Sequence, residues 1–322
     1  MVKSGKEFGL AVIGCGTIRR IRAEFARDYP GVGWLGLCDL KEDLGRKLAE
    51  DTGADLFTTD FNELLARPEV TAAIIATDEN HHVDPTLVAV ERGLDLLIEK
   101  LLATYAQASA RVFDAIEQSG MVGYANRFRR RFLAVKGKLV TGQIGDVSSV
   151  IARAFMNRMV PIATVQRTNQ RRTLTPMVVS GTHAVDMCMW LMGGKTPVSV
   201  YAGSTDIALA QYGTKDSTFG VFTMDDGAIW SMNISWALPV VWPGAVYGLE
   251  IGIVGTKGVI DIEDIHRDVV LASEVPQGAG YSPDGFSPGA ARHVEFMTSY
   301  SPGHMFGGQL WEPMREETNA WF

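Results

Sequence analysis

Lys100 is the residue of this chain best placed to do chemistry. It follows an aliphatic run, residues 94–98, and Glu99, and such a run predicts a buried strand. A lysine in a partly dry crevice beside a positively charged nicotinamide ring has a lowered pKa and can relay a proton. The alternative for this residue alone is a solvated surface lysine.

His183 is the second candidate for proton transfer. It stands in the segment Gly181-Thr-His183-Ala-Val-Asp186, which opens an apolar helix predicted over residues 182–192. His183 and Asp186 lie three residues apart and therefore share one helix face. A histidine at such a helix start can act as an acid or a base. The alternative is a core histidine with satisfied hydrogen bonds.

Gly14-Cys-Gly16 predicts a phosphate-binding turn between a strand at 8–13 and a helix at 18–29. The first glycine permits a tight turn and the second lets the backbone approach a pyrophosphate. The helix N-terminus then faces that anion. Arg19 stands where a third glycine is usual, and a plain structural turn is the alternative.

Asp39 closes the next predicted strand, residues 34–38. A carboxylate there can accept hydrogen bonds from both ribose hydroxyls of NAD and repels a 2′-phosphate. The sequence therefore favours NAD, while Arg19 and Arg20 leave NADP open. The alternative for Asp39 is a helix-capping role.

The loop Thr77-Asp-Glu-Asn-His-His82 follows a short apolar strand predicted at 72–76. In a doubly wound sheet, loops at the carboxyl ends of strands line the ligand crevice. We therefore expect this loop to contact the cofactor, with a polar helix-capping loop as the alternative.

Arginines gather in two places. The clusters contain Arg127, Arg129, Arg130 and Arg131, and then Arg167, Arg171 and Arg172. Such runs are usually solvated faces. The alternative is a substrate whose carboxylate or phosphate is held by paired hydrogen bonds.

Strands and helices alternate through the first 124 residues. Besides the elements above, we expect helices at 42–52, 61–66, 85–92 and 104–119, and a strand at 121–124. This alternation predicts an α/β Rossmann domain over residues 1–124, with a doubly wound parallel sheet.

The pattern changes after residue 125. We expect helices at 131–141 and 182–192, and strands at 147–156, 198–203, 217–224, 228–236, 247–254 and 259–262. Asp225-Asp-Gly227 and Thr256-Lys-Gly258 predict tight turns. Residues 125–322 should therefore form an α+β domain with a mostly antiparallel open sheet, and 277–303 should be a long loop.

Composition limits the function classes. The net charge of −7 argues against a general nucleic-acid binder, and no apolar run reaches the ~18–20 residues that span a bilayer. The three cysteines, Cys15, Cys38 and Cys188, are widely spaced and indicate neither a disulfide framework nor a zinc site. We expect no metal, no membrane partner and a cytoplasmic location.

The ordered motifs resemble the glucose–fructose oxidoreductase/inositol dehydrogenase (Gfo/Idh/MocA) family over nearly the whole chain. The series runs from the glycine turn through Asp39, the 77–82 loop, residues 91–100, Asn126-Arg-Phe128 and the His183 segment to Gly255-Thr-Lys-Gly258. The resemblance implies hydride transfer between nicotinamide and a carbon bearing a hydroxyl, on a sugar, polyol, cyclic diol or related acid. It also implies a homo-oligomer, a dimer or tetramer, whose open sheet mediates assembly.

The resemblance implies a role for each matching residue. Lys100 takes the proton-relay position of a Glu-Lys-Pro motif, and His183 takes that of the catalytic histidine. Cofactor contacts are expected from Gly14, Gly16, Thr17, Ile18, Asp39, Thr77, Asp78, Asn80, His82, Glu99 and Lys100. Substrate contacts are expected from Tyr124, Arg127, Arg167, Arg171 and Asp186.

Three residues depart from the family pattern. Leu101 replaces the proline, Arg19 replaces a small residue, and Val179 stands where many members have an acid. Loss of that acid indicates a different substrate or a weakened enzyme, and a non-catalytic cofactor- or sugar-binding protein is the alternative function. We also expect the C-terminus to end early, because Phe322 falls at the start of a helix that the family continues.

Overall fold

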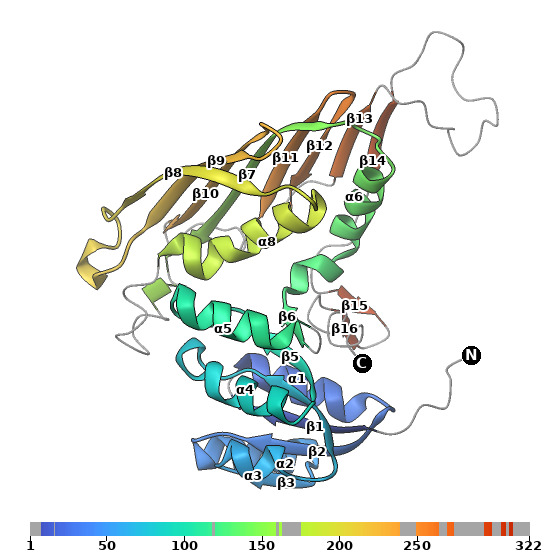
Figure 1. The fold of residues 1–322 in the computed structure, drawn as a ribbon, viewed down its shortest axis with the longest axis vertical. Coiled ribbons are helices and arrows are strands. Elements are labelled where there is room, and N and C mark those ends of the chain that lie inside the picture. The colour runs from blue at the N-terminus through green and yellow to red at the C-terminus, as the bar shows by residue number, and fades with distance from the viewer. Residues whose placement is uncertain are drawn as a thin grey trace, which may run out of the picture. The chain divides into compact units, whose positions relative to one another are not determined.

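The computed structural model describes residues 8–15, 17–117, 120–158, 161–162, 175–238, 249–263, 269–273, 293–297, 304–306 and 309–311. Two compact units meet in the sequence between Ala125 and Asn126, and Figure 1 shows the elements of each. Among the helices of these residues, none combines the length and the apolar composition that crossing a membrane requires.

The first unit is built on a six-stranded parallel sheet in the order β3-β2-β1-β4-β5-β6. Its strands are β1 (Phe8–Ile13), β2 (Val32–Cys38), β3 (Leu56–Thr58), β4 (Val70–Ile75), β5 (Asp95–Glu99) and β6 (Gly120–Gly123). Because every pair is parallel, the carboxyl ends of all six strands meet at one edge. The strand order reverses beside β1, where such sheets bind ligands.

Helices cover both faces of this sheet. They are α1 (Thr17–Asp28), α2 (Glu42–Thr52), α3 (Phe61–Leu65), α4 (Val83–Glu91) and α5 (Ala106–Ile116), with a 3-10 turn, η1 (Glu79–His81). In β1, Leu10 and Val12 join the core cluster that contains side chains of α1 and α2, whereas Ala11 and Ile13 join the cluster of α3, α4 and α5. The predicted doubly wound α/β fold is confirmed.

The second unit carries an eight-stranded sheet in the order β14-β13-β12-β11-β7-β10-β9-β8. Its strands are β7 (Val147–Asn157), β8 (Pro197–Thr205), β9 (Ser217–Met224), β10 (Ile229–Leu238), β11 (Glu250–Gly255), β12 (Gly258–Glu263), β13 (Val269–Ser273) and β14 (His293–Met297). Only the β7–β10 pair among these is parallel, so the predicted, mostly antiparallel sheet is confirmed. A separate pair is formed by β15 (His304–Phe306) and β16 (Gln309–Trp311).

Helices lie on one face of this sheet (Figure 1). They are α6 (Arg130–Val140) and α8 (Thr182–Leu191), accompanied by the turns η2 (Ala125–Phe128), η4 (Met177–Gly181) and η5 (Ala210–Tyr212). Phe132 of α6 and Met187 of α8 share a buried cluster with Trp230 and Ile251 of the sheet. On the opposite face, Ile151 and Val221 are exposed, so the sheet is open there.

Five strands were not predicted. β3, β13, β15 and β16 lie where no element was expected, and β14 lies inside the expected loop at 277–303. β14 pairs antiparallel with β13 in regular register, so that loop prediction is wrong for these five residues. The surrounding glycine and proline residues obscured a short alternating segment.

Candidate active site

The glycine turn and Asp39 are tied together at the carboxyl ends of β1 and β2. Gly14 has a φ of 107°, which favours glycine, and its N–H donates to the Cys38 carbonyl at 2.6 Å. The Cys15 N–H donates to Asp39 Oδ2 at 2.5 Å, and the Lys41 N–H donates to Asp39 Oδ1 at 2.8 Å. The Asp39 carboxylate is therefore fixed beside the turn.

Thr77 follows β4 at the same edge of the sheet. Its Oγ1 is buried and has no hydrogen-bond partner within the described part of the chain. A buried hydroxyl without a partner costs free energy, and an oxygen of a bound dinucleotide would satisfy it. This orphaned hydroxyl and the fixed Asp39 carboxylate fit an NAD site. Asp78 and Asn80 of the same loop are exposed.

His82 joins the 77–82 loop to the peptide after Lys100. Its buried ring lies between two carbonyl oxygens, with Nδ1 2.6 Å from Leu101 O and Nε2 2.8 Å from Thr77 O. Burial lowers the pKa of His82, and the hydrogen bonds to Leu101 and Thr77 act in the opposite direction. Both ring nitrogens therefore contact backbone, and the ring positions these loops.

Arg22, which the sequence analysis did not single out, contacts the residue before Lys100. It lies in α1 with 1% of its surface exposed. Its Nε and Nη2 donate to Glu99 Oε1 at 3.1 and 2.7 Å. The available signal was helical spacing, because Arg22 precedes the buried Ala26 by four residues and so shares its sheet-facing stripe. Lys100 itself is half-buried and is followed by a cis peptide bond.

In the second unit, His183 lies in the first turn of α8 and is half-buried. Asp186, one turn later, is 8% exposed. It accepts hydrogen bonds from Arg127, from Nε at 3.0 Å and also from Nη2. Burial raises the pKa of Asp186, and the bond to Arg127 opposes that rise. Two predicted substrate contacts are thus brought together as an ion pair.

Val179 contacts apolar side chains. It packs against a cluster that contains Met156, Leu209 and Trp236. Val179 belongs to η4, a π-helical turn that the sequence did not predict. Ser180 in this turn accepts a hydrogen bond from Trp236 Nε1 at 2.8 Å, which ties the turn to β10. The residue four positions before His183 therefore supplies an apolar contact where many family members have a carboxylate.

Three further residues predicted to contact cofactor or substrate, Thr17, Ile18 and Tyr124, lie in the first unit. Thr17 and Ile18 form the first turn of α1, and Tyr124 is half-buried directly after β6. Three predicted residues lie outside the described part of the chain: Gly16, Arg167 and Arg171.

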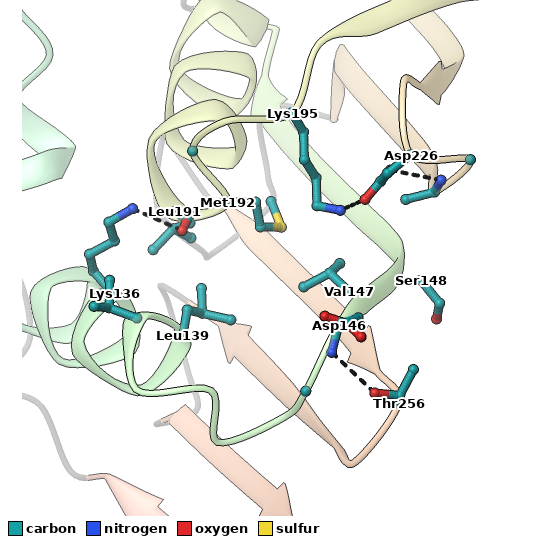
Figure 2. A pocket seen from close by; sticks show the side chains of 15 residues that line it. Lys136, Leu139, Asp146, Val147, Ser148, Leu191, Met192, Lys195, Asp226 and Thr256 are labelled. Carbon is teal, nitrogen blue, oxygen red and sulfur yellow. Dashed lines mark hydrogen bonds and ion pairs between the residues drawn. The ribbon is translucent and has the colours of Figure 1, made fainter.

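A pocket of about 720 Å³ opens in the second unit, and none of the predicted site residues lines it. Figure 2 shows that both of its lysine side chains already have partners. Lys195 forms an ion pair with Asp226, and Lys136 Nζ donates to the carbonyls of Trp190 and Leu191 at 2.5 and 3.1 Å. The lysines of this pocket therefore stabilise the unit itself.

Comparison with known proteins matches both halves of the chain to one family. Residues 8–126 match the family described as an oxidoreductase family with an NAD-binding Rossmann fold. Residues 132–261 match the GFO/IDH/MocA C-terminal domain.

Similar proteins include two curated dehydrogenases and a solved complex. Inositol 2-dehydrogenase from Gluconacetobacter diazotrophicus is 30% identical over 58% of this chain and 55% of that relative. The NAD⁺-dependent scyllo-inositol 2-dehydrogenase from Bacillus subtilis is 24% identical over 85% of this chain and 79% of that relative.

The solved complex is scyllo-inositol dehydrogenase from Lactobacillus casei with NAD(H) and scyllo-inositol. It superposes with a TM-score of 0.74 at 16% identity, covering 98% of this chain and 87% of that one. This likeness shows the shared fold. The N-terminal and C-terminal domains of the family match successive parts of this chain, so the resemblance inferred from the motifs is confirmed. The chain belongs to the Gfo/Idh/MocA family of NAD-binding oxidoreductases.

Proposed function

We propose that the protein is an NAD-dependent dehydrogenase acting on a secondary hydroxyl of a cyclic polyol, a sugar or a related hydroxylated acid. The observation that carries the proposal is the Asp39 carboxylate held beside the Gly14 turn in a family of NAD-binding oxidoreductases. Relatives named as inositol dehydrogenases support a polyhydroxylated ring as the substrate. The same site would catalyse the reverse reduction.

The cofactor side of the site is proposed to select NAD over NADP. Bound NAD supplies the hydride acceptor. Asp39 accepts hydrogen bonds from the ribose hydroxyls, and its charge repels a 2′-phosphate. Thr77 Oγ1 contributes a hydroxyl that has no partner among the described residues.

Lys100 and His183 are proposed to handle the substrate proton. Oxidation removes a hydride from the carbon and a proton from its hydroxyl oxygen. One of the two, the neutral Lys100 Nζ or the neutral His183 ring, accepts that proton, and the other holds the oxygen in place. Proton transfer by a positioned side chain typically contributes about 10²–10⁴-fold to the rate.

The substrate side is proposed to depend on Arg127. Asp186 accepts hydrogen bonds from two of its nitrogens, so the guanidinium plane is held in one orientation. From that orientation Arg127 would hold a carboxylate or several hydroxyls of the substrate, together with Tyr124, Arg167 and Arg171. The apolar environment of Val179 supports a substrate set that differs from that of members with an acid there.

A substrate panel tests the proposal. The purified protein is mixed with NAD or NADP and with myo-inositol, scyllo-inositol, glucosides or sugar acids, and cofactor reduction is followed by absorbance. We expect reduction of NAD with at least one panel member and slower reduction of NADP. A protein that fails to bind NADH contradicts the proposal.

The second candidate is a non-catalytic cofactor- or sugar-binding protein. The contact of Val179 with apolar side chains favours it, because no carboxylate stands at that position. Binding of NADH with no turnover on any panel member in either direction would support this candidate over the dehydrogenase.

We also propose that the open sheet face joins copies of this chain into a dimer or tetramer. Neighbouring outward positions across three strands carry Ile151, Ser231 and Val221. Ile151 is 61% exposed, and Phe219 and Ile229 are also exposed. Contiguous exposed apolar surface of this kind marks interaction sites, and a second copy offers a matching face.

A cytoplasmic location is proposed as well. Cys15, Cys38 and Cys188 are buried free thiols, which suits a reducing compartment. Burial raises the pKa of both Cys38 and Cys188 to about 12, so these thiols stay protonated and unreactive. Cell fractionation of the full chain would test this.

A further inference from the structure

Arg22 is buried in α1, and none of the motifs discussed above accounts for it. We propose that Arg22 is a positioning residue of the reaction: through Glu99 it fixes the end of β5 that carries Lys100. This proposal rests on the proposed role of Lys100 in proton transfer.

The contact between Arg22 and Glu99 joins segments 77 residues apart in the sequence. Both donating nitrogens reach the same oxygen, Glu99 Oε1, and the Glu99 side chain is 14% exposed. Charge-assisted hydrogen bonds are strong where little water competes. A buried guanidinium without a carboxylate partner is unfavourable, so the pair holds α1 and the end of β5 together.

Gly123 leaves the space for this pair. It is the direct neighbour of Glu99 in the β5–β6 register. A β-carbon at position 123 would stand 3.3 Å from Arg22 Nη2, which is closer than most such contacts, and 3.4 Å from Glu99 Oε2. The glycine therefore lets the guanidinium and the carboxylate approach the end of β6.

Lys100 is held from its other side as well, because His82 bonds the carbonyl of Leu101. The residues on both sides of Lys100 are thus fixed by side chains from other segments of the same unit. Arg22 also belongs to the helix that begins directly after the glycine turn. One helix therefore faces the proposed pyrophosphate site and positions the proposed proton-transfer lysine.

The experiment compares Arg22→Met with Arg22→Lys and with a control on the same helix, Arg27→Met. Arg27 is exposed and pairs with Asp28 at the surface. Four quantities are measured: amide hydrogen exchange at residues 99–103 without cofactor, the NADH dissociation constant, and kcat and KM on an active member of the substrate panel.

For Arg22→Met we expect faster exchange at residues 99–103. We also expect kcat to fall by about 10²-fold, the loss typical of a catalytic group displaced by about 1 Å, while NADH affinity and KM stay unchanged. Arg22→Lys should recover part of kcat, and Arg27→Met should match the wild type. A folded Arg22→Met protein with wild-type exchange and wild-type kcat would overturn the proposal.

If Arg22→Met does not fold, the Arg22→Lys variant tests the proposal instead. Faster amide exchange at residues 99–103 with a wild-type melting temperature supports the proposal. Unchanged exchange together with unchanged kcat overturns it. If the wild type binds NADH without turning over any substrate, the proposed dehydrogenase function fails. In that case the exchange measurement alone still shows whether Arg22 fixes the end of β5.

Discussion

The cofactor edge of the first unit and the helix side of the second hold their candidate residues in different ways. At the cofactor edge, three contacts join segments far apart in the sequence. They tie Asp39 to the glycine turn, His82 to the peptide after Lys100, and Arg22 to Glu99. The loops that follow β1, β2, β4 and β5 are therefore each fixed by another segment of the unit.

In the second unit an ion pair joins two of the residues proposed for substrate. Arg127 and Asp186 lie 59 residues apart in the sequence, and Asp186 lies in α8 together with His183. Val179, four residues before His183, packs against an apolar cluster. We expect a substitution at the cofactor edge to disturb more than one segment of the first unit, and a substitution of Val179 to affect its apolar cluster.

The largest effect is expected from Lys100→Ala. Turnover should fall by about 10²–10⁴-fold, because a positioned proton acceptor is lost, while NADH binding stays intact since the contacts around Asp39 remain. Steady-state kinetics measure turnover, and fluorescence titration with NADH measures cofactor binding. Full turnover in this variant, with cofactor still bound, would show that Lys100 takes no part in proton transfer.

Asp39→Ala should have the next largest effect. NAD affinity should fall by about 10–100-fold, which corresponds to the ~1.5–3 kcal/mol of hydrogen bonds to a charged group. The preference for NAD over NADP should shrink because the repelling carboxylate is gone. Calorimetric titration with both cofactors measures this, and unchanged affinity for both would show that the ribose lies elsewhere.

The Asp216→Asn variant tests whether the second unit also contains a loop, residues 205–208, that is fixed by hydrogen bonds to one side chain. Asp216 is buried and accepts hydrogen bonds from Thr205, from Ala208 N–H and from Ile207 N–H at 2.6 Å. Burial acts to raise the pKa of Asp216, but these hydrogen bonds outweigh it and the pKa is lowered. The unfolded chain then binds the proton more readily than the folded one.

The stabilisation from Asp216 is therefore present above its ordinary pKa of 3.8 and is lost as the pH falls through the lowered value. At neutral pH the variant should be less stable by about 1–3 kcal/mol, with a smaller difference in acid. Urea unfolding at both pH values measures this. Asp206→Asn, at an exposed ion pair with Lys215, is the control and should change little; an equal loss in both variants would contradict the prediction.

Ile151→Glu should have the smallest effect on the chain itself. The residue is exposed on the open sheet face, so stability of the isolated subunit should change by no more than about 0.5 kcal/mol. Assembly should nevertheless weaken, because a charge would be buried between copies. Light scattering measures the mass of the assembly, and Val140→Glu, at an exposed position on α6, is the control. An unchanged mass for Ile151→Glu would show that the interface between copies does not include this sheet face.

Most of the fold could be predicted because its strongest signals are local. Buried parallel strands consist of runs of aliphatic residues that are easy to recognise in a sequence. Helix α2 was predicted with its observed bounds because Gly53 ends it in a left-handed conformation. The missed strands, β3, β13, β14, β15 and β16, have only three to five residues and lie at or next to sheet edges. Such strands bury little and leave a weak pattern.

The candidate site could be predicted only where its residues belong to a motif. Asp39 and the glycine turn are brought together by parallel strands, which the alternating pattern already implies. The pairing of Arg22 with Glu99 depends on how α1 packs on the sheet, and no short-range pattern specifies a partner 77 residues away. The π turn before His183 changes backbone hydrogen bonding without a characteristic composition, so the sequence contained no signal for it.

The narrow space at Gly123 has an evolutionary consequence. A β-carbon there would stand 3.3 Å from Arg22 Nη2, so the guanidinium would have to shift by a few tenths of an ångström. Homologues with a larger residue at position 123 should therefore carry a smaller residue at position 22. An alignment of relatives should show these two columns changing together, and independent variation would mean that the strand end relaxes to make room.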